Sequence, residues 1–333
     1  MSYFLRRLGF FVLTLWAAIT LNFLIPRLQP GDPAQAIINR INGQQHRPPN
    51  PEQVHAIRLM LGLPHTGLLQ QYGDYLRSVT RLDFGTSYTF FPYSVTHVIG
   101  QALPWTLVLS VVTTVVGFII GTVLGAFAAA KRNSAFDSVV SLGSTFIGTL
   151  PFFWVAMLLL YLFAFELSVL PQGGGYSGFL TPGFNSTFIL DAAYHSILPA
   201  AAILITAPIG WILTMRNNMV QILGADFTRL ARAKGLAGKR IVLNYGARNA
   251  ILPNVTGFAL ALGTIVAGQL FIEQIFGYPG MGKLLFEAVG DRDYPLMQAI
   301  FLFITIGVLV ANLIADFLYG VLDPRVRRSG ETS

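Results

Sequence analysis

Long apolar runs recur along the chain, and shorter polar connections separate them. A helix that crosses the ~30 Å hydrocarbon layer of a bilayer needs about 20 mostly apolar residues, because each residue adds only ~1.5 Å of length. The pattern therefore predicts an all-α membrane protein that forms a single domain over residues 1–333. Its six expected spanning helices cover residues 8–25, 103–130, 139–165, 197–215, 252–275 and 297–322.

The first apolar run also has the features of a cleavable signal peptide. Arg6 and Arg7 precede it, and the sequence Ala-Gln-Ala at 34–36 has the small-x-small form of a cleavage site. The run is longer than an ordinary signal core, however, and the Ala-Gln-Ala site lies beyond Arg27 and Asp32. We therefore expect an uncleaved first span.

Composition agrees with a membrane protein. Of the residues, 53% are hydrophobic and 11% are charged, and a soluble core could not enclose so much apolar surface. The chain has no cysteine, which excludes disulfides, thiolate metal sites and a cysteine nucleophile. The formal net charge is +7, but the basic residues lie between apolar runs and do not alternate with solvated aromatic residues, so binding of nucleic acid is disfavoured.

The distribution of basic residues indicates the orientation. With a cytoplasmic N-terminus, most of the 22 lysine and arginine residues fall on the cytoplasmic side, as the positive-inside rule requires. Both termini are then expected in the cytoplasm. The longest cytoplasmic connection is 216–251, and the segment 30–100 lies outside the cell.

The two external connections differ in character. Within 30–100, a proline-rich turn at 48–51 precedes apolar residues at helical spacing over 54–76, which predicts an external helical subdomain. The segment 166–194 has no basic residue and carries three consecutive glycines at 173–175. It is typical of an irregular external loop or a re-entrant cap.

Small residues and prolines shape the spans. Gly117, Gly121 and Gly125 repeat every four residues and predict a helix face that a neighbouring backbone can approach closely. Three prolines interrupt the third and fourth spans and are expected to bend them, either for shape alone or to let a pathway open and close. They are Pro151, Pro199 and Pro208.

Polar side chains near the apolar layer are rare. Asn22, Glu273 and Asp316 are the candidates, and a carboxylate in this environment is costly enough to indicate either a structural or a pathway role. No regular arginine series and no recurrent pair of intramembrane carboxylates occurs, so voltage sensing and an ion relay are disfavoured.

Sequence motifs for catalysis are missing. None of the five histidines stands in an HExxH arrangement, and no GxxxxGK[ST] loop for ATP occurs. We assign no catalytic, cofactor-binding or metal-binding residue to this chain.

The densest positive charge lies in the sequence RLARAKGLAGKR at 229–240, within the longest cytoplasmic connection. Asp226 is expected to cap a short helix that ends at Gly235. Ala231 and Ala233 are expected to keep its surface small, and three basic side chains project outward: Arg229, Arg232 and Lys234. A second amphipathic piece covers 241–245. Two short helices on the cytoplasmic face suit docking into a groove of a partner.

Several stretches resemble one known family. The chain resembles the permease subunits of ATP-binding-cassette importers in the dipeptide, oligopeptide and nickel branch, as a B-type subunit, over nearly its whole length. The matching stretches, in order, are 28–33 (LQPGDP), 82–87 (LDFGTS), 195–199 (HSILP), 226–235 (DFTRLARAKG), 248–253 (RNAILP) and 273–282 (EQIFGYPGMG). The chain departs from the general importer signature, because Arg229-Leu-Ala replaces Glu-Ala-Ala and Pro253 lies eighteen residues beyond Gly235. The longer spacing is similar to the peptide branch and unlike the maltose-type branch.

The resemblance implies a type I importer permease in the inner (plasma) membrane. A second, related permease subunit would complete the pathway, two ATPase subunits would bind ATP and Mg, and an external binding protein would deliver di- or oligopeptides. Lipid would surround the spans. In such a system the short helix acts as a coupling helix, through Asp226, Arg229, Ala231, Arg232, Ala233, Lys234 and Gly235.

Other functions remain possible from sequence. The same kind of importer could carry oligosaccharides or nickel chelates. A secondary transporter would need coupling-ion ligands in broken helices. A membrane hydrolase would need a catalytic constellation, and an exporter would not need the external segments.

Overall fold

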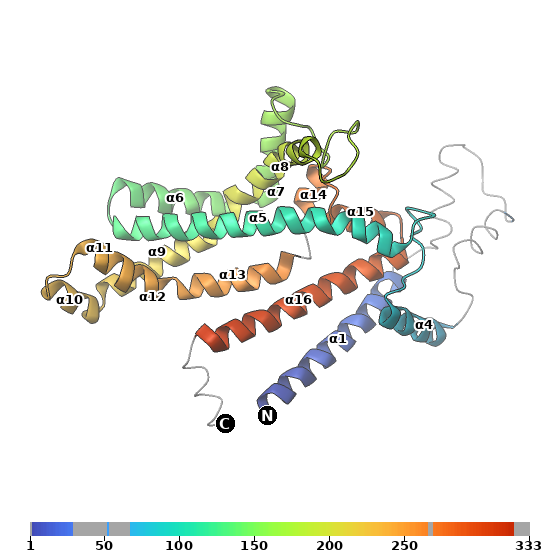
Figure 1. The fold of residues 1–333 in the computed structure, drawn as a ribbon, viewed down its shortest axis with the longest axis horizontal. Helices are drawn as coiled ribbons and strands as arrows, with labels where there is room; N and C mark the ends of the chain where they lie inside the picture. The colour runs from blue at the N-terminus through green and yellow to red at the C-terminus, as the bar shows by residue number, and fades with distance from the viewer. Residues whose placement is uncertain (1, 29–51, 53–66, 266–268, 323–333) are drawn as a thin grey trace. The chain divides into compact units, whose positions relative to one another are not determined.

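The computed structural model describes residues 2–28, 52, 67–265 and 269–322, and Figure 1 shows their fold. Within these residues all regular structure is helical, apart from one isolated bridge between Thr86 and Ser94. The chain forms two compact units. The first comprises residues 1–106, 266–270 and 279–309, and the second comprises 107–265, 271–278 and 310–333.

The first unit is built around an apolar core shared by several of its helices. It contains α1 (Ser2–Leu28), α4 (Leu68–Arg81), the first part of α5 (Val95–Ala130), α15 (Met281–Gly290) and the first part of α16 (Tyr294–Leu322). Side chains at the start of α5 pack with those of α15 and α16. The most deeply buried are Val95, Ile99, Met281, Ala288, Leu296 and Ile300.

Helix α4 lies against α1. Phe23 packs its ring on Tyr72 and Tyr75, with ring centroids 5.1 and 5.6 Å apart, and the hydroxyl groups of Thr20 and Tyr72 form a 2.8 Å hydrogen bond. This helix belongs to the expected external subdomain at 30–100, of which the structure describes residues 52 and 67–100. The proline-rich turn and the apolar positions at 54–61 lie outside the described residues.

Asp293 fastens the loop at 84–94 to the start of α16. Its carboxylate accepts hydrogen bonds from the Ser87 hydroxyl (2.5 Å), the Thr89 N–H (2.9 Å) and the Leu296 N–H (3.1 Å). The side chain is fully buried. Burial raises the pKa of Asp293 above its ordinary value, and the hydrogen bonds from Ser87, Thr89 and Leu296 oppose that rise.

The second unit holds most of the remaining helices. They are the rest of α5, α6 (Ala135–Thr149), α7 (Phe152–Leu160), the π-helix η1 (Tyr161–Glu166), α8 (Ser186–Thr206), α9 (Pro208–Gly224), α10 (Asp226–Ala233), α11 (Gly238–Arg240), the π-helix η2 (Ile241–Ala247), α12 (Arg248–Ala250), α13 (Leu252–Thr264) and α14 (Leu270–Ile275), whose first residue belongs to the first unit.

Helix α9 packs directly on the glycine face of α5. A Cβ atom placed on Gly121 would lie 2.8 Å from the carbonyl oxygen of Pro208, and one on Gly125 would lie 2.9 Å from the Cβ of Met215. Real side chains do not fit at such distances, so the backbones meet here because both positions are glycine. The prediction of a close helix approach is confirmed.

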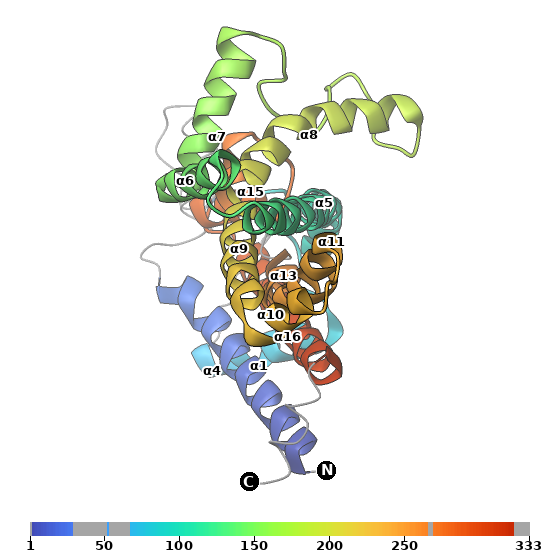
Figure 2. The ribbon, with the colours of Figure 1, turned by 90° about the vertical axis from the view of Figure 1, so that its left-hand side faces the viewer.

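The third predicted span is sharply bent. Helices α6 and α7–η1 meet at 93°, with the break at Leu150 and Pro151, and Figure 2 shows α7 leaving α6 at a steep angle. Pro208 is the first residue of α9, after a one-residue interruption at Ala207. Helix α8 instead continues through Pro199. The predicted bend is thus strong at Pro151, while the expected interruption at Pro199 does not occur.

The connection between η1 and α8 is irregular, as its composition predicts. The Tyr194 hydroxyl donates to the carbonyl of Val169 (2.6 Å), and Asp191 accepts from both the N–H and the hydroxyl of Ser177 (2.7 Å each). These bonds tie the loop to the outer part of α8.

Length and composition qualify fewer helices as spans than the sequence pattern predicts. In the described part of the chain, Val95–Ala130 and the continuous stretch Ser186–Gly224 qualify, and the bent pair α6 with α7–η1 makes a third if it counts as one span. Shorter apolar stretches lie in α1, α13 and α16. Large apolar side chains such as Val139, Leu142 and Phe146 on α6 are exposed, which indicates a protein embedded in lipid.

Candidate functional site

Helix α10 carries the first part of the basic sequence 229–240 and begins directly after α9. Ala225 connects the two in an extended conformation, and its carbonyl accepts the N–H groups of Thr228 and Arg229. Asp226 is therefore the first helical residue and not the cap, so the prediction that it caps the helix is wrong. Its side chain is 98% exposed and lies 3.5 Å from Arg229, where negative charge still favours a helix N-terminus.

Gly235 ends this helix as predicted. Its φ angle is +76°, in the left-handed region that glycine adopts without strain. The Gly235 N–H donates to the carbonyl of Arg232 (2.9 Å), and the Leu236 N–H donates to the carbonyl of Ala231 (3.3 Å). The carbonyl groups of the last turn are thereby satisfied and the chain reverses toward α11.

One face of α10 is fixed to the helices behind it. Thr228 is fully buried, and its hydroxyl donates to the carbonyl of Ile222 on α9 (2.9 Å). Ala231 is also buried, so the prediction that Ala231 keeps the outer surface small is wrong. Its small side chain instead lets α10 lie close to the rest of the unit, where α10 packs against α9 and η2.

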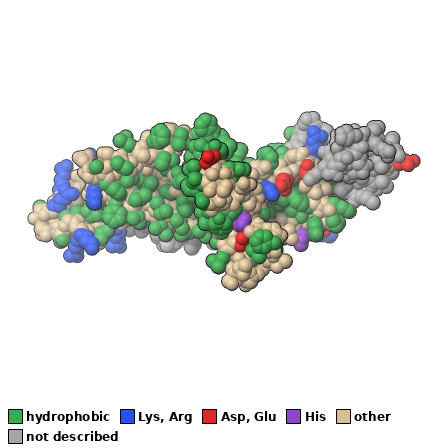
Figure 3. Space-filling view, turned by 90° about the horizontal axis from the view of Figure 1, so that it is seen from above, with side chains coloured by type: hydrophobic (Ala, Val, Ile, Leu, Met, Phe, Trp, Pro, Cys, Tyr) green, Lys and Arg blue, Asp and Glu red, His purple; other side chains and the backbone are tan. Residues whose placement is uncertain are grey.

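The opposite face of α10 is exposed and mixes basic with apolar side chains. Arg229, Arg232, Ala233 and Lys234 are exposed as predicted. Phe227 and Leu230 are 48% and 57% exposed, and sequence reasoning did not single them out. Phe227 and Leu230 are three residues apart, so they are neighbours on the surface of a helix that also carries the basic residues. This spacing is the signal that could have identified them. In Figure 3, Lys and Arg side chains gather at the end of the second unit that contains α10 and α11.

Helix α9 supports this end of the unit. Met215 and Met219 are buried with Ala129 and Ala250. Gly246 of η2 lies against α9, and a Cβ atom there would lie 3.0 Å from Leu223. The segment from α11 to α12 therefore packs along α9, and a displacement of α10 acts on a packed group of helices.

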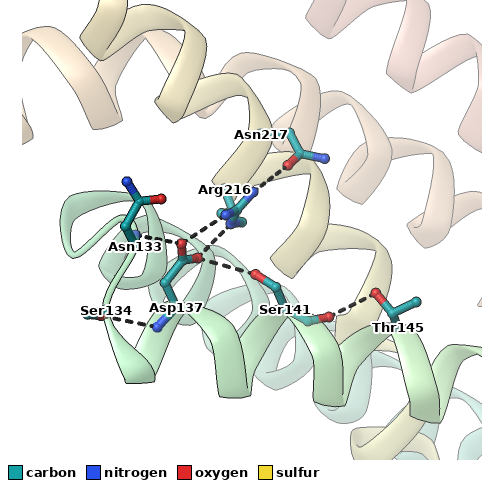
Figure 4. A network of polar contacts seen from close by, with 7 residues as sticks. All are labelled: Asn133, Ser134, Asp137, Ser141, Thr145, Arg216 and Asn217. Atoms are coloured by element: carbon teal, nitrogen blue, oxygen red, sulfur yellow. Dashed lines mark hydrogen bonds and ion pairs between the residues drawn. The ribbon is translucent and has the colours of Figure 1, made fainter.

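An ion pair that sequence reasoning missed ties α6 to α9. Arg216 donates from Nε to one oxygen of Asp137 (2.7 Å) and from Nη2 to the other (2.9 Å), as Figure 4 shows. Asp137 also accepts from the Asn133 N–H (3.1 Å) and the Ser141 hydroxyl (3.2 Å). Arg216 was expected only as one of the cytoplasmic basic residues, and no local pattern marks Asp137 as its partner.

The predicted intramembrane polar residues do not all fall in one unit. Asn22 is buried in α1 of the first unit, and Glu273 is fully buried in α14 of the second. Asp316 lies on α16, and its side chain is outside the described residues. Within the second unit two of the matching stretches do meet: the Ser196 and Tyr278 hydroxyl groups are 3.1 Å apart, and the Tyr278 N–H donates to the Glu273 carbonyl (2.8 Å).

The described side chains offer no grouping of three His, Asp or Glu residues that could hold a metal ion. The site that the structure does assemble is a short helix, anchored on one face and exposed on the other.

Comparison with known proteins gives a consistent result. Residues 121–328 match the family model described as the inner membrane component of binding-protein-dependent transport systems. The chain is 36% identical to the di/tripeptide transport system permease protein DppB of Pseudomonas aeruginosa, over 98% of this chain and 99% of the relative. It is 34% identical to the dipeptide transport system permease protein DppB of Escherichia coli and 33% identical to the oligopeptide transport system permease protein AppB of Bacillus subtilis, with the same coverage in both cases. The chain therefore belongs to the family of inner membrane permease components of binding-protein-dependent transport systems.

Proposed function

We propose that this chain is a permease subunit that forms half of the pathway for di- or oligopeptides in an ATP-driven importer. Family membership supports the transport role, and the three relatives described above are named for dipeptide, di/tripeptide or oligopeptide transport. The observation that carries the mechanism is the geometry of α10, which is anchored to α9 through Thr228 and Ala231 and presents Phe227 and Leu230 outward.

The partners follow from this role. A second, related permease subunit completes the pathway, two ATPase subunits bind ATP and Mg beneath it, and an external binding protein delivers the peptide. The protein has six spans in the inner membrane, and both termini are cytoplasmic. Three of the spans are the apolar stretches of α1, α13 and α16, which are too short to qualify by length alone. No cofactor-binding residue is proposed in this chain.

Helix α10 acts as the coupling helix that docks on the ATPase. Exposed ion pairs contribute only about 0.2–1 kcal/mol each, so Arg229, Arg232 and Lys234 orient the contact more than they strengthen it. Burial of Phe227 and Leu230 in a groove of the partner supplies most of the affinity, because a few central apolar anchors dominate protein interfaces. We expect a groove with an apolar floor and acidic residues along its rim.

The test replaces Leu230 by serine in a complex purified from cells that express all the subunits. We expect loss of copurified ATPase and of uptake of labelled dipeptides, with the permease still inserted in the membrane. Leu69→Ser is the control, because Leu69 is also exposed but lies on α4 in the first unit. Normal ATPase yield and uptake with Leu230→Ser would contradict the role of α10.

A companion measurement addresses the substrate. Uptake of labelled di- and oligopeptides is compared with uptake of oligosaccharides and nickel chelates in the same membranes. Peptide uptake that depends on ATP and on this chain supports the proposal. Uptake confined to a sugar or a chelate contradicts the peptide assignment and leaves the coupling role standing.

A further inference from the structure

Helices α6 and α9 run antiparallel against each other along their whole contact. Near the cytoplasmic end Asp137 pairs with Arg216, and at the other end a Cβ atom on Gly148 would lie 3.3 Å from Cγ2 of Ile209. The two contacts lie eleven residues apart on α6 and seven apart on α9. They fix both ends of the packed region, so α6 and α9 form a two-helix layer in the second unit.

This layer ends at a proline beside each of the two helices. Helix α6 stops at Leu150 and Pro151, where the backbone is extended, and α7 departs at 93°. On the other side Pro208 begins α9 next to Gly148, and the backbone at Ala207 stays helical. A proline has no N–H to donate, so each position lacks a helical hydrogen bond and bends more easily than an intact helix. Beyond it, α7 packs on α8.

The ion pair itself is built to hold a fixed geometry. Asp137 receives both nitrogen donors of a fork from Arg216 and two further donors, while its side chain is only 5% exposed. Such a bidentate contact is more directional than a single bond, and loss of one partner leaves a poorly solvated charge behind. The exposed pair Arg229–Asp226 has a single contact at 3.5 Å and no comparable constraint.

A direct path leads from this pair to α10. Arg216 lies on α9, two turns before Ile222, whose carbonyl accepts the hydroxyl of Thr228 on α10. A displacement of α10 is therefore delivered to α9 first. Without a link to α6, α9 could move past α6 by sliding along an apolar contact.

We propose that Asp137 and Arg216 are positioning residues for transport: their ion pair makes α6 move together with α9 when α10 is displaced. The break at Leu150 and Pro151 is the joint between this two-helix layer and α7. This inference rests on the proposed role of α10 as a coupling helix. Neither residue contacts the transported peptide in this assignment. They determine how much of the ATPase movement reaches the bent span.

The first test measures the number of ATP molecules hydrolysed per peptide transported in the purified complex reconstituted in vesicles. Arg216→Gln is expected to raise this ratio about tenfold, within the range of ordinary coupling energies, while the ATPases copurify at the wild-type yield. Arg216→Lys keeps the charge and is expected to recover part of the coupling. Lys283→Gln is the control, because Lys283 pairs at 3.4 Å with Glu287 in the first unit.

The outcomes separate this inference from the proposed function. If the ATPases fail to copurify with the wild-type chain, the proposed function fails. If they copurify and Arg216→Gln transports peptide with the wild-type ratio, only the inference fails. The inference is also overturned if complex yield, ATP hydrolysis and transport fall in parallel while the ratio of ATP hydrolysed to peptide transported stays unchanged. That result would show that the ion pair has a structural role alone.

A second test uses the absence of native cysteines. The pair Gly148→Cys and Ile209→Cys places two thiols at the far end of the α6–α9 contact. Because α6 and α9 move as one layer, the cross-linked complex is expected to keep at least half of the uptake of its reduced form, with each single variant as a control. Loss of uptake on oxidation, restored by a reductant, would show that the two helices separate during transport and would overturn the inference.

Discussion

Two buried aspartates, one in each unit, show two ways of keeping a carboxylate away from water. Asp293 accepts from neutral donors, which are the Ser87 hydroxyl and backbone N–H groups that include those of Thr89 and Leu296. Asp137 has the guanidinium of Arg216 beside it. The first arrangement fastens the loop at 84–94 to the start of α16, and the second fastens α6 to α9. A hydroxyl and backbone amides suffice to hold a loop on a helix, whereas the link between the two helices uses a full opposite charge.

The largest effect is expected from removal of the charged partner in the second unit. Asp137→Ala leaves the Arg216 guanidinium without its counter-ion, and breaking such a pair costs on the order of 3 kcal/mol when one side is partly solvated. Thermal unfolding in detergent measures the loss. The double variant Asp137→Ala with Arg216→Met is expected to recover most of it, because no unpaired charge remains; an additive loss in the double variant would contradict the comparison.

A smaller effect is expected at Asp293. Asp293→Ala leaves the buried Ser87 hydroxyl and the Thr89 N–H without their acceptor, which costs on the order of 2 kcal/mol. Asp293→Asn keeps one acceptor oxygen and no charge, so it is expected to cost about half as much. The same unfolding experiment compares the two. If Asn is as damaging as Ala, the negative charge of Asp293 matters and the contrast with Asp137 disappears.

The smallest effect is a dependence on pH. Because burial raises the pKa of Asp293, the folded state binds its proton more tightly than the unfolded state, whose pKa is about 3.9. The stabilisation from this group is complete below the unfolded pKa and is lost as the pH rises through the higher folded pKa. The unfolding temperature of the wild type is therefore expected to fall relative to Asp293→Asn as the pH rises through that window. An increasing or constant difference would contradict the assignment.

Local features of the site were predictable from the sequence, because glycine and apolar runs act at short range. Gly235 ends α10 since a left-handed turn needs a residue without a Cβ. The glycines of α5 predicted a close neighbour, although not that the neighbour is α9.

The errors and omissions have a common physical origin in tertiary contacts. Ala231 is buried because α9 and η2 lie behind it, and residue spacing does not identify them. Asp226 does not cap α10, because the extended backbone at Ala225 already supplies the turn out of α9. Asp137 and Arg216 are 79 residues apart, and nothing local to either position indicates that they meet. Residue spacing likewise did not identify the outward side of α10, which carries the exposed Phe227 and Leu230.

Trp211 lies where α5, α9 and α13 meet, and this position provides an optical probe. Its ring contacts Phe118 edge to face at 5.8 Å, its indole nitrogen would lie 3.4 Å from a Cβ on Gly257, and its carbonyl accepts from Asn254. The chain has four tryptophans, so replacing Trp16, Trp105 and Trp154 by phenylalanine leaves a single emitter at this junction. Its fluorescence would then report, in real time and without any attached dye, whether the packing of these three helices changes during turnover.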